Sequence, residues 1–278
     1  MSFARMGHGP LDYELVNFEG TPLRFRGPQP DPDAPFMLCL GSSETFGKFV
    51  AEPYPATLSE LTGLPVMNMG VMNAGLEVML HDPVVQDMMT RAEGIVLQIM
   101  GAQNMTNRFY TVHPRRNDRF LKASAILQTI YRDVDFTEFH FTRHMLNSLL
   151  QSSRDRFEIV TDELQAAWLG RMKAVLSRVE CPVHLLWMAQ QNPAEEATTD
   201  DILGADPLFV TQAMLEEVAP LAASLTTCVA TAAEQVAPTK GMFFAAQEEA
   251  AARILPGPDM HSRAARALAQ KIAMVGAP

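Results

Sequence analysis

The sequence predicts an α/β fold of three layers, α/β/α, in which helices cover both faces of a mostly parallel five-stranded sheet. Five short apolar runs, most of them ending at turn residues, are typical of buried strands; they lie at about 35–40, 65–69, 94–100, 182–189 and 225–230. Segments with helical spacing alternate with these runs, which favours a parallel sheet between two helical layers. With 278 residues, 47% of them hydrophobic and 19% charged, the chain is long enough for one sizeable core. We therefore expect a single domain over residues 1–278.

The segments that surround the first strands have distinct patterns. Residues 1–34 are rich in Pro and Gly and lack a periodic apolar pattern, so we expect an N-terminal arm packed over the sheet. Residues 46–62 and 75–92 are expected to be helices between successive strands. Two prolines, Pro53 and Pro55, should break or kink the first of these helices.

The connection between the third and fourth strands is much longer than the usual crossover of roughly 10 to 15 residues. Its apolar spacing predicts helices near 118–132, 136–151 and 156–179. We interpret residues 118–180 as a helical insertion or cap. Because it leaves the end of the third strand, we expect it to cover the carboxyl edge of the sheet and to influence substrate choice.

The end of the first strand holds the first candidate nucleophile. The apolar run stops at Gly41 and is followed by Ser42 and Ser43, ahead of a helical segment. This order places a hydroxyl at the carboxyl edge of the sheet, where α/β folds bind their ligands. Ser43 is therefore a candidate nucleophile, although the two serines could simply cap the following helix.

Three later segments also place polar residues after strands or before a helix. Asn73 lies in the turn after the second strand, and Gln103 and Asn104 follow the third strand. Asp259 and His261 stand in a turn just ahead of the final helix. The alternative for each is a structural role, such as tying a turn or capping a helix.

These four segments, in this order, resemble the four sequence blocks of the SGNH (GDSL) hydrolases, and the chain is similar to a divergent member of that superfamily. The resemblance implies the flavodoxin-like SGNH fold. Several positions depart from the family pattern: Ser42 stands where the family has Asp, and Asn73 stands where a Gly is expected. Gln103 takes the place of an Asn, and Asp259 precedes His261 by two residues instead of three.

The resemblance also implies a role for each residue. Ser43 would be the nucleophile, His261 its base, and Asp259 the group that orients the imidazole. The oxyanion would be held by the N–H groups of Ser43 and Asn73 and by a side-chain amide, from Gln103 or Asn104. Side chains expected to contact the substrate are Ser42, Glu44 and Asn107.

The implied activity is that of a serine esterase or deacylase acting on an acylated small molecule or carbohydrate. Two alternatives stay open. A non-catalytic binding or assembly protein with the same fold is favoured by the departures from the family pattern. An acyltransferase would use the same site with an acceptor other than water.

Composition and motifs argue against several other classes. The net charge of −10 disfavours binding to nucleic acid or to an anionic membrane. We find no run of 18 apolar residues and no secretory signal at the N-terminus, so we expect a cytoplasmic protein without a membrane span. No phosphate loop or Gly-x-Gly-x-x-Gly motif follows a strand, so no cofactor is predicted.

One segment has the spacing of a metal site. His140 and His144 are four residues apart, with Asp135 and Glu138 nearby. Because no third His or Cys completes a ligand set, we prefer packing of the surrounding phenylalanines and predict no metal. The acidic loop at residues 195–201 is interpreted as a solvated flap.

Overall fold

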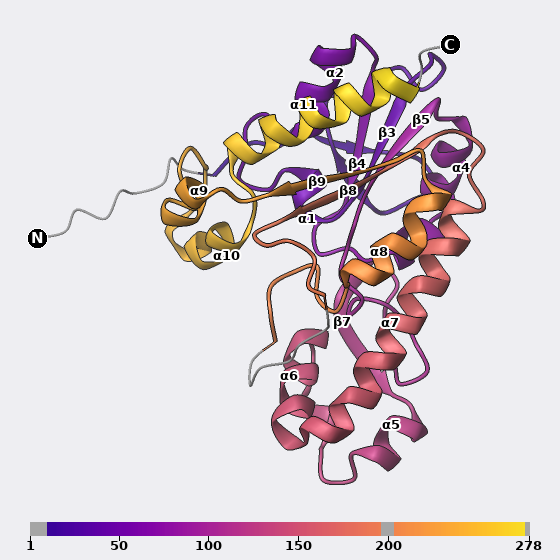
Figure 1. Cartoon of the computed structure of the whole chain (residues 1–278), viewed down its shortest axis with the longest axis vertical. Helices are drawn as coiled ribbons and strands as arrows, with labels where there is room; N and C mark the ends of the chain where they lie inside the picture. Colours follow the sequence, from indigo (N-terminus) through magenta and orange to yellow (C-terminus); the bar gives the residue numbers. More distant parts are fainter. Residues whose placement is uncertain (1–9, 196–202, 276–278) are drawn as a thin grey trace, which may run out of the picture.

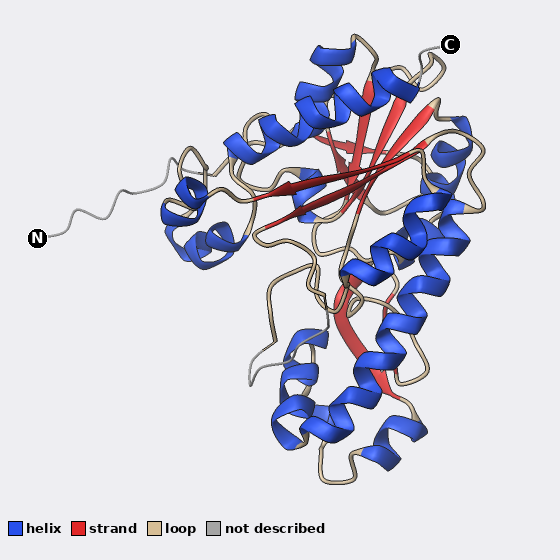
Figure 2. Cartoon of the chain, viewed as in Figure 1, coloured by secondary structure: helices blue, strands red, loops and turns tan. Residues whose placement is uncertain are grey.

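The computed structural model describes residues 10–195 and 203–275. At its centre is a parallel sheet (Figure 2). The order of its strands is β4-β3-β5-β8-β9. Its strands are β3 (Met37–Gly41), β4 (Val66–Gly70), β5 (Gly94–Gln98), β8 (Val183–Ala189) and β9 (Ser224–Val229). Numbered along the chain, this is the order 2-1-3-4-5 of flavodoxin-like sheets. The predicted fold class is confirmed, and each strand begins and ends within two residues of its predicted bounds.

Alternation along the strands divides the core into two halves, one on each face of the sheet. In β3, Leu38 and Leu40 point to one half, whereas Met37 and Cys39 point to the other. Helices α2 (Tyr54–Thr62) and α11 (Pro258–Val275) pack on one face, and α4 (Pro83–Arg91), α7 (Arg154–Leu176) and α8 (Gln212–Val218) pack on the other (Figure 1). Both faces of the sheet are therefore covered, as a parallel sheet requires.

The N-terminal arm contains a small hairpin of β1 (Leu15–Asn17) and β2 (Arg24–Arg26). Phe25 and Arg26 are buried. The Arg26 guanidinium donates to the carbonyl oxygens of Phe46 (3.3 Å), Gly47 (2.7 Å) and Ala51 (2.7 Å). The arm therefore fastens the segment that follows the first sheet strand. Residues 1–9 of the predicted arm lie outside the described residues.

Both helices predicted between the first strands are divided. The first consists of the short α1 (Ser43–Phe46), a loop, and α2, which has Pro55 in its first turn. The second consists of α3 (Glu77–His81) and α4, separated by Asp82. The Asp82 carboxylate accepts from the backbone N–H groups of the first turn of α4, so this residue ends one helix and caps the next.

The prediction of a helix near 118–132 is wrong. Its first half is a strand, β7 (Arg116–Ala123), paired antiparallel with β6 (Tyr110–His113), and only α5 (Ala125–Ile130) is helical. The pairing contains register shifts, so the buried residues Asn117, Phe120 and Ala123 are three apart instead of two. This spacing imitates that of a helix.

The rest of the insertion is helical, as predicted. It comprises η1 (Phe136–Glu138), α6 (Thr142–Ser152) and α7. In Figure 1, β7, α5 and α6 form a lobe below the sheet, and α7 runs from this lobe along one sheet face. Trp168 of α7 donates to the carbonyl oxygen of Met100, just after β5 (2.8 Å). That the insertion sets substrate preference stays a prediction.

After β9 the chain forms α9 (Ala232–Val236), η3 (Ala246–Glu248) and α10 (Glu249–Ile254) before α11, and η2 (Ala219–Leu221) joins α8 to β9. Within the described ranges, no helix is long and apolar enough to cross a membrane. Residues 196–201 of the predicted acidic flap lie outside the described residues.

Candidate functional site

Ser43 is the first residue of α1, directly beyond the carboxyl end of β3. It is 5% exposed. A Cβ added to Gly41 would lie 2.1 Å from Thr45 Oγ1 and 2.3 Å from Gln98 Oε1, so only glycine fits where the strand turns into α1. The predicted position of Ser43 at the carboxyl edge is confirmed by this geometry.

Asn73, in the turn after β4, faces Ser43. Its backbone N–H donates to Ser43 Oγ (3.1 Å), and the Ser43 hydroxyl donates to Asn73 Oδ1 (3.4 Å). The φ angle of Asn73 is +58°, in the left-handed region that Asn tolerates better than most residues. The expectation that Asn73 could adopt the backbone shape of a glycine is therefore confirmed.

Gln98, at the end of β5, organises the turn that carries Ser43. Its Oε1 accepts from Ser42 N (2.9 Å), Thr45 N (3.2 Å) and Thr45 Oγ1 (2.7 Å). Its Nε2 donates to Glu44 Oε2 (2.8 Å). Our sequence analysis missed this residue, although a glutamine inside an otherwise apolar strand is a signal that could have revealed it.

The two amides considered for the oxyanion site differ in availability. Gln103 Nε2 donates to Asp206 Oδ1 (2.7 Å), so its donor is engaged, and its buried Oε1 has no partner among the described residues. Asn104 Oδ1 accepts from Thr142 Oγ1 (2.8 Å), which fixes the carboxamide through its oxygen and leaves its NH₂ group as the donor. Asn104 is therefore the better placed of the two.

Ser43 opens into a cavity of about 140 Å³, which we call the Ser43 pocket. Most of the predicted site residues line it: Ser42, Ser43, Glu44, Asn73, Gln103 and Asn104. A larger cavity of about 670 Å³ shares part of its wall, namely Glu44, Asp206, Ile254 and Leu255. Arg143 of α6 lines this larger cavity and pairs with Asp206 (3.0 Å), which our sequence analysis also missed. The insertion therefore contributes directly to the rim of the site.

His261 does not form the expected hydrogen bond to Ser43. The imidazole is 1% exposed, and its Nδ1 accepts the backbone N–H of Tyr54 (3.0 Å) while the ring stacks on that of Tyr54. Its buried Nε2 has no partner among the described residues. A catalytic triad needs the opposite arrangement, in which Nδ1–H donates to the carboxylate and Nε2 accepts from the nucleophile. Burial also lowers the pKa of His261 to about 3.

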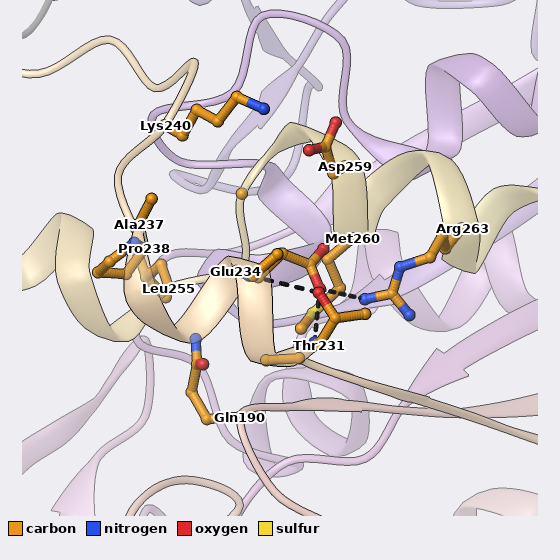
Figure 3. Close-up of a pocket in the computed structure, with 13 residues that line it drawn as sticks. Gln190, Thr231, Glu234, Ala237, Pro238, Lys240, Leu255, Asp259, Met260 and Arg263 are labelled. Carbon is orange, nitrogen blue, oxygen red and sulfur yellow. Dashed lines mark hydrogen bonds and ion pairs between the residues drawn. The ribbon is translucent and has the colours of Figure 1, made fainter.

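Asp259 belongs to a different cavity, of about 240 Å³, between α9 and the start of α11 (Figure 3). Figure 3 shows Asp259 at the rim of this cavity, above the ion pair between Arg263 and Glu234 (2.6 Å). The reason is that α11 begins at Pro258, so Asp259 and His261 lie in its first turn instead of in a loop. In this geometry the predicted triad is not assembled, and the catalytic roles of its members stay predictions.

Two other predicted residues or clusters have structural roles. Asn107 Oδ1 accepts from Phe109 N and Tyr110 N, so Asn107 ties a turn. In the segment considered for a metal, Asp135 caps η1 and His144 packs edge-on against Phe139. Over the described part of the chain, no group of three or more His, Cys, Asp or Glu residues is arranged to hold a metal ion.

Two carboxyl groups near Ser43 have perturbed acidity. Burial raises the pKa of Glu44; the Asp206 carboxylate adds to this effect, and the hydrogen bond from Gln98 opposes it. Burial likewise raises the pKa of Asp118, whose Oδ2 accepts from Asn73 Nδ2 (3.5 Å). The pocket thus combines a small hydroxyl, backbone and amide donors, and a carboxyl group that holds its proton more strongly than usual.

Comparison with solved structures finds likenesses at low identity. A carbohydrate esterase family 2 enzyme with a carbohydrate-binding domain, from Corynascus thermopiles (Myceliophthora fergusii), is 11% identical over 90% of this chain and 69% of its own, with a TM-score of 0.45. An acetylxylan esterase from Geobacillus stearothermophilus is 14% identical over 88% and 95%, with a TM-score of 0.40. A protein from Slackia heliotrinireducens, named as a candidate SGNH hydrolase, is 16% identical over 86% and 100%, with a TM-score of 0.33.

The matched structures are thus SGNH-type hydrolases and carbohydrate esterases, but at these scores the likeness says nothing of activity or substrate. No curated protein matches the chain. One family model, described as a domain of unknown function (DUF6473), matches residues 1–275. Since this match covers almost the whole sequence, the chain belongs to the DUF6473 family.

Proposed function

We propose that this protein is a serine esterase or deacylase that acts on an acylated small molecule or carbohydrate, with Ser43 as the nucleophile. The observation that carries the proposal is the pair formed by Ser43 and Asn73. A hydroxyl at the carboxyl end of the first sheet strand lies 3.1 Å from a backbone N–H in a left-handed turn, inside a cavity. Such a turn offers a donor whose position depends on the backbone alone.

In the proposed reaction, Ser43 Oγ attacks the acyl carbon and the carbonyl oxygen becomes an oxyanion. The N–H groups of Ser43 and Asn73 and the NH₂ group of Asn104 are the donors proposed to hold it. The polar wall of the Ser43 pocket suits an acyl ester of a polar alcohol, such as a sugar. Fixed donors of this kind contribute about 10²- to 10³-fold each to the rate of acyl transfer.

His261 can serve as the base, as the sequence resemblance implies, only if the first turn of α11 rearranges. That change would expose the imidazole and leave the Tyr54 N–H without its acceptor. An unsatisfied buried donor costs about 1–3 kcal/mol, so the rearrangement is an appreciable but accessible cost.

A non-catalytic binding protein is the second candidate, and one contact favours it. The Ser43 hydroxyl donates to the side-chain oxygen of Asn73, and Asn73 Nδ2 approaches Asp118. This chain of Ser, Asn and Asp orients the hydroxyl as a triad does, but a carboxamide oxygen is far too weak a base to take the proton. A ligand with hydrogen-bonding groups would bind such a site without reacting.

Labelling with a serine-reactive fluorophosphonate distinguishes the two candidates. We expect the wild type to be labelled at Ser43 and to hydrolyse p-nitrophenyl acetate or butyrate. Ser43→Ala should abolish both, by about 10⁴-fold or more in rate. The matched control Ser148→Ala, a half-buried residue of α6 whose hydroxyl donates only to the carbonyl oxygen of His144, should leave both unchanged. An unlabelled, inactive wild type would overturn the esterase proposal and favour the binding protein.

A further inference from the structure

The Ser43 pocket must supply a proton acceptor if Ser43 is to react, and its wall offers few. Among the described residues that line the pocket there is no histidine. The ionisable side chains are those of Glu44, Lys48 and Asp206. A base for Ser43 that needs no rearrangement of the fold must therefore come from these three residues.

Two of the three are committed to ion pairs. Lys48 Nζ lies 3.3 Å from Glu248 Oε1, and an ammonium group is not a base in its charged form. Asp206 receives a hydrogen bond from Gln103 on one oxygen and pairs with Arg143 on the other, at 3.0 Å. Protonation of Asp206 would weaken its ion pair with Arg143, so Asp206 is the poorer base of the two carboxylates.

Glu44 is arranged differently. Its Oε2 accepts from Gln98 Nε2 (2.8 Å), which fixes the carboxylate, and a hydrogen bond from its own backbone N–H lowers its pKa, whereas no other side chain in the described part of the chain donates to Oε1. Glu44 lines both the Ser43 pocket and the adjoining larger cavity, so a substrate that fills them would pass this side chain. Of the two pocket carboxylates, Glu44 is the one without an ion-pair partner among the described residues.

We propose that Glu44 is the proton-transfer residue of the pocket, acting on Ser43 through a water molecule. This inference rests on the proposed esterase function. A bridging water is needed because consecutive residues of a helix do not face each other. A cavity of about 140 Å³ has room for one, since a water molecule occupies about 30 Å³ of liquid volume.

Each step of the proposed reaction conserves protons and electron pairs. As the Ser43 Oγ–carbon bond forms, the hydroxyl proton passes to the water and a proton of the water passes to the Glu44 carboxylate. When the carbon–oxygen bond to the alcohol breaks, the same relay returns the proton to the leaving oxygen. In the second half, Glu44 takes a proton from the water that attacks the acyl-enzyme, and Ser43 regains its hydrogen as the acid is released.

The charged and titratable groups around Glu44 decide its pH dependence. They are Asp206, whose carboxylate disfavours ionisation of Glu44; Tyr54, whose pKa burial raises well above its ordinary value, so that the phenol stays neutral; and Lys48, Arg143 and Arg253 in the cavity walls. Each of these cations is paired with a carboxylate: Glu248, Asp206 and Glu249, respectively. Burial, followed by Asp206, raises the pKa of Glu44. Because the ionised form is the base, the rate should fall as pH drops through a value above the ordinary Glu range of about 4.3.

The test is the rate of fluorophosphonate labelling at Ser43 from pH 3 to pH 9, for the wild type and four variants. Glu44→Gln keeps an oxygen that can accept from Gln98, so the turn should stay folded. We expect its labelling to be about 10²- to 10⁴-fold slower and to lose the acidic limb of the profile. Added formate should restore part of the rate to Glu44→Ala, an effect that a purely structural role would not produce. Glu216→Gln, on the exposed side of α8, is the matched control and should keep the rate and profile of the wild type.

Two results would overturn the inference while the esterase proposal survives. One is a Glu44→Gln variant labelled at the wild-type rate with an unchanged profile. The other is loss of labelling in His261→Asn together with an acidic limb that persists in Glu44→Gln, which would assign the base to His261. An unlabelled wild type would instead remove the esterase proposal, and this inference with it.

Discussion

Replacing Gln98 with Leu should destabilise the turn that carries Ser43 while it leaves the packing of the sheet nearly unchanged. The substitution nearly conserves side-chain volume, so it creates little cavity, but it removes the oxygen that accepts three hydrogen bonds. The Thr45 hydroxyl can still pair with Tyr54 Oη, 3.0 Å away. The N–H groups of Ser42 and Thr45 would lose their acceptor.

The expected loss of stability follows from these two donors. A buried donor left without a partner costs about 1–3 kcal/mol, so the two together should lower the free energy of unfolding by about 3–4 kcal/mol. For a chain of this size, about 2–4 °C of melting temperature corresponds to each kcal/mol. We therefore expect Gln98→Leu to melt about 6–15 °C below the wild type.

Urea unfolding followed by circular dichroism, together with a thermal melt, measures this difference. The matched control is Gln128→Leu, at an exposed residue whose Nε2 donates a hydrogen bond to the carbonyl oxygen of Ala123 (3.1 Å). It should change the free energy of unfolding by less than about 1 kcal/mol. If Gln98→Leu lies within 1 kcal/mol of the wild type, the account of Gln98 as the organiser of this turn is wrong.

Two further predictions concern Gly41 and His261. Gly41→Ala should lower the free energy of unfolding by about 2–3 kcal/mol, because the added Cβ would clash with Thr45 Oγ1 and Gln98 Oε1. Gly170→Ala, in open space on α7, should instead raise the free energy of unfolding by about 0.5–1 kcal/mol. Equal urea midpoints for the two variants would contradict this. His261 has a pKa of about 3 when folded against an ordinary value of 6.5, so the unfolded state binds the extra proton and stability is lost as pH falls from 6.5 toward 3. Between pH 7 and pH 5 the wild type should therefore lose about 2 kcal/mol more than His261→Asn, measured by urea unfolding at each pH, and equal losses would show that the imidazole is accessible to protons in the folded state.

The strands were predictable because each is a short apolar run bounded by turn residues, and in a parallel sheet both faces of a strand are buried. The position of Ser43 followed from the same pattern, since a hydroxyl after a buried strand must lie at the carboxyl edge. The left-handed turn at Asn73 was predictable from residue type. These inferences depend on neighbours in the sequence alone.

The predictions that failed needed information from distant residues. The strand pairing of β7 is bulged, so its buried residues acquire the spacing of a helix, and only its partner β6 reveals the difference. The position of His261 depends on where α11 begins. Proline is favoured in the first turn of a helix, so Pro258 was a signal that His261 lies inside the helix and not before it. Asp206 comes from a loop without a recognisable pattern, and no local rule places it beside Gln103.

The hydrogen bonds of Arg26 show what the protein would lose if its N-terminal arm were removed. A protein that started at β3 would keep the sheet and both helical layers, yet three carbonyl oxygens at the end of α1 and just after it would lose the guanidinium that now satisfies them. The hairpin of the arm therefore stabilises the segment after β3, and a shortened protein should begin before this hairpin. The same hydrogen bonds connect the arm to the segment that carries Ser43. A protease cut between β2 and β3 should therefore loosen the position of Ser43 while the sheet stays intact.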